Sequence, residues 1–283
     1  MIALLTACAV AAAVVWLTAA LLRKSARLEH PRGDRWHIAP TPSFGGIGLA
    51  AGIIAGALIA GDAVPAAAVP CIAFAALAGT ADDILRLRPA TKLLSQALVL
   101  PLFAIYLPEA AGIAGITGLC LLYLAVVNAV NLFDNFDGAL AVTAVGSLAA
   151  GAFTGIIPAG SVGLAAAGIG GTAGFALWNL PPARIFMGET GAAALAATMF
   201  WCAVGDESDG CALRLLALAA LPVADALRVA AARTLRGKRF WEGGRDHAAH
   251  IIAGRIRPAF VLLAFAVAQA WVVVSISYIF KKL

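Results

Sequence analysis

Five carboxylate side chains lie at the ends of long apolar segments, where a chain of this composition should avoid them. They are Asp82, Asp83, Asp134, Asp137 and Glu189. An ionised carboxylate beside hydrocarbon is costly unless a cation compensates it, so such residues are candidates for function. Carboxylate oxygens, together with substrate phosphates, are the ligands that Mg²⁺ prefers. The five residues therefore predict a magnesium and phosphate site at a membrane surface.

The composition sets the class of protein. The chain has 283 residues, of which 62% are hydrophobic and only 12% are charged, whereas soluble domains usually carry about twice that charge. We expect an all-α, polytopic membrane protein with one transmembrane catalytic domain, residues 1–283. The net charge of +5 reflects the sorting of basic loops to one membrane face and does not indicate nucleic-acid binding. The five cysteines show no CxxC spacing, so they indicate neither a disulfide framework nor a metal site.

Ten apolar segments are long enough to cross a bilayer, at roughly 20 residues per span. They lie near residues 2–22, 44–61, 65–81, 91–107, 112–131, 138–157, 160–178, 190–205, 212–231 and 258–279. Most Lys and Arg residues fall in or beside alternate loops, at 23–43, 82–92, 132–137, 179–189 and 232–257. By the positive-inside rule these loops face the cytoplasm. An even number of spans then places both termini in the periplasm.

The first two basic loops each hold a short motif. Gly45 and Gly46 follow two prolines, and glycines let a backbone approach another backbone or a ligand closely. Asp82 and Asp83 are adjacent, so their charges repel each other unless a cation shares them. That cation could be Mg²⁺, or one aspartate could act as a base. Pairing with neighbouring arginines at a solvated helix end is the alternative.

The third loop carries a row of polar side chains at helical spacing. Asn128, Asn131, Asp134 and Asp137 follow one another at i, i+3, so they share one stripe of a helix. Two amides and two carboxylates in one row at the end of an apolar helix are hard to explain as packing. The stripe predicts a binding surface for a polar ligand.

The last two loops add groups that suit phosphates. A helix is predicted to begin at Glu189, and its first N–H groups suit a phosphate; a simple capping role for Glu189 is the alternative. Phe186 could stack on a base or anchor the loop at the headgroups. Arg245, His247 and His250 could bind a pyrophosphate or shuttle a proton, and interfacial placement of the histidines is the alternative.

In this order and on one face, the motifs resemble those of the polyprenyl-phosphate N-acetylhexosamine-1-phosphate transferases, of the glycosyltransferase family 4 type. The family's boxes look like PxPxxGG, DD with a downstream Lys and Gln, NxxNxxDGxDGLA, FMGDxGS and a His-rich final loop. The matching segments here are residues 40–46, 82–96, 128–141, 186–191 and 243–250. The resemblance covers most of the chain. It implies about ten transmembrane helices in the bacterial cytoplasmic (inner) membrane, with the site facing the cytoplasm.

Several positions depart from the family's pattern. Asn135 stands where the family often has Gly, and Glu189 replaces the Asp of FMGD. Glutamate keeps the charge but moves the carboxylate by ~1.5 Å. A catalytically weakened member that binds lipid phosphate or nucleotide is therefore one alternative. A transporter is another, although the carboxylates gather at one face and do not form a path across the membrane.

The resemblance implies a defined reaction. A sugar-1-phosphate, of the N-acetylhexosamine type, would pass from a UDP-N-acetylamino sugar to a polyprenyl phosphate in the inner leaflet. UMP would leave, and cell-envelope glycan synthesis would begin. The final loop looks closer to the undecaprenyl-phosphate GlcNAc-1-phosphate transferases than to phospho-MurNAc-pentapeptide translocase. The particular sugar, the lipid length and a homodimeric assembly stay open, and direct attack is favoured over an aspartyl-phosphate.

The resemblance also implies roles for individual residues. Mg²⁺, with Mn²⁺ as the alternative, would be held by Glu189 with Asp83 or Asp134. Asp82 would deprotonate or orient the lipid phosphate. The remaining predicted substrate-binding and catalytic residues fall into three groups: Asn131, Asp137 and Phe186 toward the nucleotide, Lys92, Arg245, His247 and His250 at the phosphates, and Asn128, Gly45 and Gly46 as further substrate-binding residues.

Overall fold

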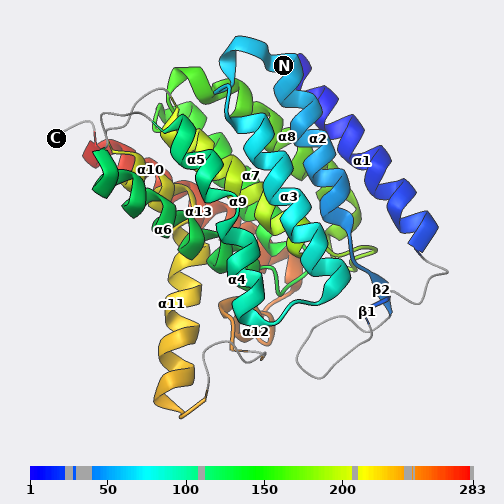
Figure 1. Ribbon diagram of the computed structural model, residues 1–283. Helices are drawn as coiled ribbons and strands as arrows, with labels where there is room; N and C mark the ends of the chain where they lie inside the picture. The colour runs from blue at the N-terminus through cyan, green and yellow to red at the C-terminus, as the bar shows by residue number, and fades with distance from the viewer. Residues whose placement is uncertain are drawn as a thin grey trace.

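A computed structural model describes most of the chain. The described residues are 1–22, 28–29, 40–107, 112–205, 210–238, 244 and 246–280. The secondary-structure elements are α1 (Ile2–Leu22), β1 (Leu28–Glu29), β2 (Thr41–Pro42), α2 (Gly45–Ala60), η1 (Gly61–Ala63), α3 (Ala68–Leu85), α4 (Pro89–Ala97), α5 (Leu100–Tyr106), α6 (Gly112–Phe133), α7 (Ala139–Thr154), η3 (Ala159–Ser161), α8 (Val162–Asn179), α9 (Gly188–Val204), α10 (Cys211–Leu218), α11 (Ala220–Leu235), α12 (Ala248–Ala253) and α13 (Pro258–Phe280). The all-α prediction is confirmed, apart from the short antiparallel pair of β1 and β2 (Figure 1).

The chain is a multi-pass membrane protein, with fewer clear spans than predicted. Among the described residues, six helical segments are long and apolar enough to cross a membrane, and the bent pair of α10 and α11 would be a seventh candidate if it is counted as one span. The six segments are Ile2–Leu22, Gly45–Ala63, Ala68–Leu85, Gly112–Phe133, Ala159–Asn179 and Pro258–Phe280. Each of the ten predicted segments does contain helix, but ten crossings are not confirmed.

The difference between the ten predicted spans and the candidate spans has a structural reason. The predicted fourth span is broken into the short helices α4 and α5, and α7 and α9 have only 16 and 17 residues. Figure 1 shows α1 beginning and α13 ending on the same side of the bundle, opposite β1, β2 and α12. This arrangement agrees with both termini on one membrane face, and their periplasmic location stays a prediction.

Helix α9 forms the centre of the bundle. Every residue from Thr190 to Val204 is buried, and α9 packs against α2, α3, α6, α8 and α10. Its N-terminal half is rich in Gly and Ala, which allows neighbouring helices to approach closely. A central helix that is apolar on all sides needs no polar face. The first turn of α9, with Glu189, is therefore held by the core of the protein.

A polar side chain on α13 supports the break between α10 and α11, where the two axes differ by 76°. Gln269 is fully buried. Its Nε2 donates to the carbonyl oxygens of Ala217 and Leu218 at 2.9 and 3.0 Å, and its Oε1 accepts from the Leu221 N–H at 2.9 Å. Backbone groups freed inside a membrane must find such partners. These hydrogen bonds support the bend, after which α11 extends away from the other helices (Figure 1).

Candidate functional site

A small cleft lies between α3, α4, α6 and α9. Its polar lining includes Asp82 from α3, Lys92 and Gln96 from α4, and Glu189 from α9, and its walls are otherwise mostly apolar. The sequence predicted that Asp82, Lys92 and Glu189 belong to one site. The structure brings these three side chains together, although they are separated by up to about a hundred residues in the chain.

Lys92 bridges two carboxylates in this cleft. Its Nζ lies 3.6 Å from Asp82 Oδ2 and also forms an ion pair with Glu189 Oε1. The other oxygen of Asp82 accepts a hydrogen bond from the Leu87 N–H at 2.9 Å. The cation that these carboxylates require is therefore supplied by the protein itself in this structure. A lysine ammonium is a mobile point charge on a flexible stem, so it can be redirected toward a phosphate.

Asp83 points away from Asp82 and caps α9. Its carboxylate accepts hydrogen bonds from the Glu189 N–H at 2.9 Å, the Thr190 N–H at 3.0 Å and Thr190 Oγ1 at 2.7 Å. Gly188 adopts φ +71°, and a Cβ there would lie 2.8 Å from Asp83 Oδ2. The first N–H groups of α9, which the sequence predicted for a phosphate, are thus taken by Asp83. A carboxylate stabilises a helix N-terminus for the same electrostatic reason.

Gly45 and Gly46 contact the protein backbone next to Glu189. The Gly45 N–H donates to the Phe186 carbonyl at 2.9 Å, and the Gly46 N–H donates to the Met187 carbonyl at 2.8 Å. A Cβ on Gly46 would lie 2.1 Å from the Gly191 nitrogen, so only glycine fits there. Of the two approaches that the sequence left open, the structure shows the approach of backbone to backbone. The pair fixes the segment that carries Phe186 and Glu189.

The stripe on α6 is divided between two neighbours. Asn128 Nδ2 donates to Gln96 Oε1 at 2.8 Å and so belongs to the cleft. Asp137 Oδ2 accepts from the Ala183 N–H at 3.0 Å and holds the segment between α8 and α9. Asn131 and Asp134 lie half-buried between these two positions in the chain. Asn128 and Asn131 lie on α6, which ends at Phe133, whereas Asp134 and Asp137 lie in the turns that follow, so the predicted row does not continue along one helix.

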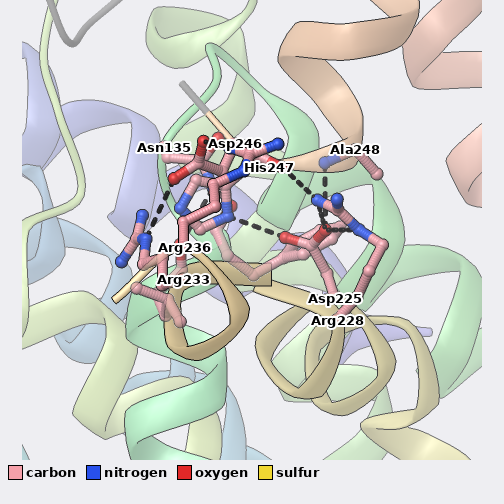
Figure 2. Close-up of polar contacts among 10 residues, drawn as sticks. Asn135, Asp225, Arg228, Arg233, Arg236, Asp246, His247 and Ala248 are labelled. Atoms are coloured by element: carbon pink, nitrogen blue, oxygen red, sulfur yellow. Dashed lines mark hydrogen bonds and ion pairs between the residues drawn. The ribbon is translucent and has the colours of Figure 1, made fainter. Parts of the chain in front are cut away.

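The final loop is docked on α11 by a second polar cluster, shown in Figure 2. His247 Nδ1 lies 2.7 Å from Asp225 Oδ2, and both side chains are buried. Asp246 is bound by Arg233 and Arg236, at 3.0 and 3.2 Å. The hydrogen bond from Arg233, together with the nearby positive charges, holds the pKa of Asp246 below its usual range. The loop is therefore fixed to the helix on both sides of the Asp246–His247 peptide bond.

His250 lies beside His247 in this cluster. Its ring packs edge-on against Phe136, with centroids 5.9 Å apart, and 6.3 Å from the ring of His247. This contact connects the final loop to the turn that follows α6. Arg245, the third predicted residue of the loop, lies outside the described residues.

Sequence reasoning missed Asp225 and Gln269. Both are buried polar side chains inside segments that were predicted to be apolar spans. An acidic residue at such a position is itself a signal, because an intramembrane carboxylate is costly unless it is paired. Asp225 could therefore have been found from the sequence, whereas its pairing with His247 could not, because the two residues lie on separate elements.

The predicted metal set is not gathered in one place. Within the part of the chain that the structure describes, no group of three or more His, Cys, Asp and Glu side chains could hold a metal ion. Asp83 is committed to α9, so Glu189, Asp83 and Asp134 do not form the predicted trio. Asp82 and Glu189, which share Lys92, do fit Mg²⁺, because this ion often takes only one or two protein carboxylates and completes its shell with phosphates and water.

Comparison with known proteins supports the family for the central part of the chain. Residues 66–205, just under half of the chain, match the sequence model of Glycosyl transferase family 4. This stretch contains Asp82, Asp83, Lys92, the α6 stripe and Glu189, but not the final loop. The family predicted from the motifs is thus supported for the segment that forms the cleft.

Two curated relatives carry the same name. A phospho-N-acetylmuramoyl-pentapeptide-transferase of Corynebacterium efficiens is 39% identical over 85 residues, which is 30% of this chain and 23% of the relative. Its counterpart in Corynebacterium aurimucosum is 37% identical over 87 residues, again 30% and 23%. The matched part thus spans about a quarter of each relative's length. These similarities do not support the predicted closeness to the GlcNAc-1-phosphate transferases.

Proposed function

We propose that this protein transfers a sugar-1-phosphate from a UDP-activated amino sugar to a polyprenyl phosphate and releases UMP. The observation that carries the proposal is the gathering of Asp82, Lys92 and Glu189 around one cleft within the segment that matches family 4. The two carboxylates can bind a divalent cation, and the lysine ammonium can turn toward a pyrophosphate.

The proposed reaction is a direct displacement. An oxygen of the lipid phosphate attacks the sugar-linked phosphorus, the bond from that phosphorus to the bridging oxygen breaks, and UMP leaves with the electron pair. Phosphoryl transfers depend mainly on positioning and on neutralisation of charge. Asp82 orients the incoming phosphate, and Lys92 turns from the carboxylates to the phosphates when substrate enters. Asp83 contributes by holding Glu189 at the start of α9.

A divalent cation, Mg²⁺ with Mn²⁺ as the alternative, would be held by Glu189 and Asp82, with Asp134 as a further predicted ligand. When bound, it would neutralise charge on the pyrophosphate. Asn131, Asp137 and Phe186 stay the predicted residues toward the nucleotide, and Asn128 stays a predicted substrate-binding residue. His247, His250 and Arg245 stay the predicted groups at the phosphates.

The proposed location follows from the basic loops. The motif residues and the final loop lie in the segments predicted to face the cytoplasm of a bacterial inner membrane, where nucleotide sugars are available. The identity of the donor sugar has to be determined separately. The names of the two relatives make a UDP-MurNAc-pentapeptide a donor to be tested beside UDP-GlcNAc.

The test uses purified protein in detergent with undecaprenyl phosphate, Mg²⁺ and a panel of UDP-sugars that includes both donors. We expect UMP release with at least one donor, loss of release on chelation, and recovery with Mg²⁺ or Mn²⁺. Asp82→Asn and Glu189→Gln should lower kcat by about 100-fold or more, in the range of lost transition-state electrostatics. Asp62→Asn, an exposed change in η1, is the control. No UMP from any donor, or full activity of Asp82→Asn, would disprove the mechanism.

A second candidate function rests on the ion pair of Glu189 with Lys92. If this pair holds the site closed, the protein binds lipid phosphate or nucleotide without turnover. Glu189→Asp distinguishes the two, because the shorter side chain withdraws from Lys92. Activity that appears only in Glu189→Asp supports the weakened member, and activity in the wild type excludes it.

A further inference from the structure

Asp225 is a buried carboxylate that the proposed mechanism does not use. It lies on α11 with 6% of its surface exposed. A buried charge is strongly destabilising when it lacks partners, so the contacts of this residue indicate what it does. The contacts of Asp225 join α11 to the final loop or fix the orientation of its own carboxylate.

Both oxygens of Asp225 are engaged. Oδ2 lies 2.7 Å from His247 Nδ1. Oδ1 accepts from the Ala248 N–H at 2.9 Å and from Arg228 Nη2 at 2.9 Å. Figure 2 shows these contacts converging on one carboxylate. The carboxylate is therefore held on one side by its own helix and on the other by the loop, and it has little freedom to turn.

The consequence for His247 is a fixed ring. When one imidazole nitrogen is bound by a carboxylate, that bond sets the tautomer and the ring orientation, and the other nitrogen is left for chemistry. No described residue hydrogen-bonds to His247 Nε2. The pairing thus commits Nδ1 to the protein.

The neighbouring contacts keep this geometry in place. Arg228 also donates to the Asp246 carbonyl, and Arg233, which is 1% exposed, binds the Asp246 carboxylate. The residues before and after His247 are therefore anchored on the same face of α11. A free loop could not hold an imidazole within the narrow limits that a reaction requires.

We propose that Asp225 is a positioning residue for the transfer reaction, which holds the His247 imidazole so that Nε2 meets a phosphate of the bound substrates. This inference rests on the proposed function. Asp225 acts only through His247 and touches no substrate itself.

The test is a double-mutant cycle on UMP release, with the best donor from the panel. Asp225→Asn keeps the shape but weakens the acceptor, and we expect kcat to fall roughly 10–100-fold, as for other residues that orient an imidazole. KM for the UDP-sugar should change by less than about threefold, since the effect falls on a step after binding. In a His247→Ala background, the same change should lower kcat by less than about twofold.

Non-additivity separates positioning from mere folding. A structural defect would lower the active fraction equally in both backgrounds, so equal losses would overturn the proposal. Asp225→Glu should restore part of the lost kcat, and Asp62→Asn should leave it unchanged. If Asp225→Asn does not accumulate as folded protein, Arg228→Gln replaces it in the cycle. That variant removes one of the two donors to Oδ1 and the contact to the Asp246 carbonyl without changing the bond between Asp225 and His247, and its smaller loss should also vanish in the His247→Ala background.

The outcomes also separate this inference from the proposed function. An active wild type whose kcat is unaffected by both Asp225→Asn and Arg228→Gln would overturn this inference alone. A wild type without UMP release from any donor would overturn the proposed function and this inference with it.

Discussion

The cleft and the final loop both hold carboxylates beside apolar helices, but they neutralise them differently. In the cleft, Asp82 and Glu189 share one lysine whose side chain is 18% exposed. Where the final loop docks on α11, Asp225 of the helix and Asp246 of the loop are bound by several donors, among them Arg233, whose side chain is 2% exposed. One flexible ammonium can leave its partners when a ligand arrives, whereas a planar guanidinium in a buried network cannot. The cleft is therefore arranged for exchange of charge, and the final loop for rigidity.

The largest effect should come from Asp83, which connects the cleft to the core. In Asp83→Ala, two backbone N–H groups and the Thr190 hydroxyl lose their acceptor. Loss of a charged acceptor at such buried donors costs about 2–3 kcal/mol, and Glu189 loses its fixed position. We expect a lower midpoint of thermal unfolding in detergent and loss of UMP release. An unchanged midpoint would show that α9 does not need this cap.

Gln269→Leu tests whether the rigidity of the final loop depends on the break between α10 and α11. Two carbonyl oxygens and one N–H would lose a buried partner, at a cost of about 1–3 kcal/mol. Activity should fall with stability, because α11 carries Asp225. Ser147→Ala, which removes a hydroxyl that contacts the same Leu218 carbonyl, is the matched control with a smaller effect. Equal effects of the two changes would contradict the central role of Gln269.

Lys92→Gln and Arg233→Gln compare the two regions directly. Lys92→Gln should lower kcat by about 10–100-fold, since phosphates lose a cation, and should change the unfolding midpoint little. Arg233→Gln should lower the free energy of unfolding by about 1–2 kcal/mol, because a buried donor leaves Asp246, with a smaller effect on kcat. Measuring kcat and thermal unfolding for both variants decides the matter. The reverse pattern would remove the distinction between an exchangeable and a rigid cluster.

The smallest effect concerns pH and Asp246. Because folding lowers the pKa of this carboxyl group, its stabilising contribution is complete above the unfolded value, about 3.9, and is lost as pH falls through the folded value. Wild type and Asp246→Asn should differ by less than about 1 kcal/mol at pH 7. The difference should shrink below about pH 4. A difference that grows on acidification would show that the carboxylate is not the stabilising form.

Much of the site was predictable because its residues are chemically unusual for their surroundings. Asp82, Lys92 and Glu189 were predicted to act together from the order of the motifs and the side of the membrane, and the cleft contains all three. The different tasks of Asp82 and Asp83 were not predictable. Adjacent residues on a helix point about 100° apart, and only the packing of α3 against α9 decides which of the two faces the cleft.

The ten predicted spans are not confirmed, for a related reason. Apolar length alone does not distinguish a helix that crosses in one piece from the broken pair α4 and α5, or from the central helix α9. Hydropathy reports that a segment avoids water, but it does not report whether lipid or protein surrounds it. The break at Ala219 depends on Gln269, which lies about fifty residues further along the chain.

The sequence by itself determined the class of this protein, a helical membrane protein with acidic and basic motifs on one face, because composition and charge sorting are local properties. It also determined the residue types available for a phosphate and metal site. Tertiary structure alone decided their partners: Lys92 between Asp82 and Glu189, Asp83 on α9, and Asp225 beneath His247. A hydrogen bond or ion pair requires approach to within about 3–4 Å, and between distant segments only the packing of helices brings that about.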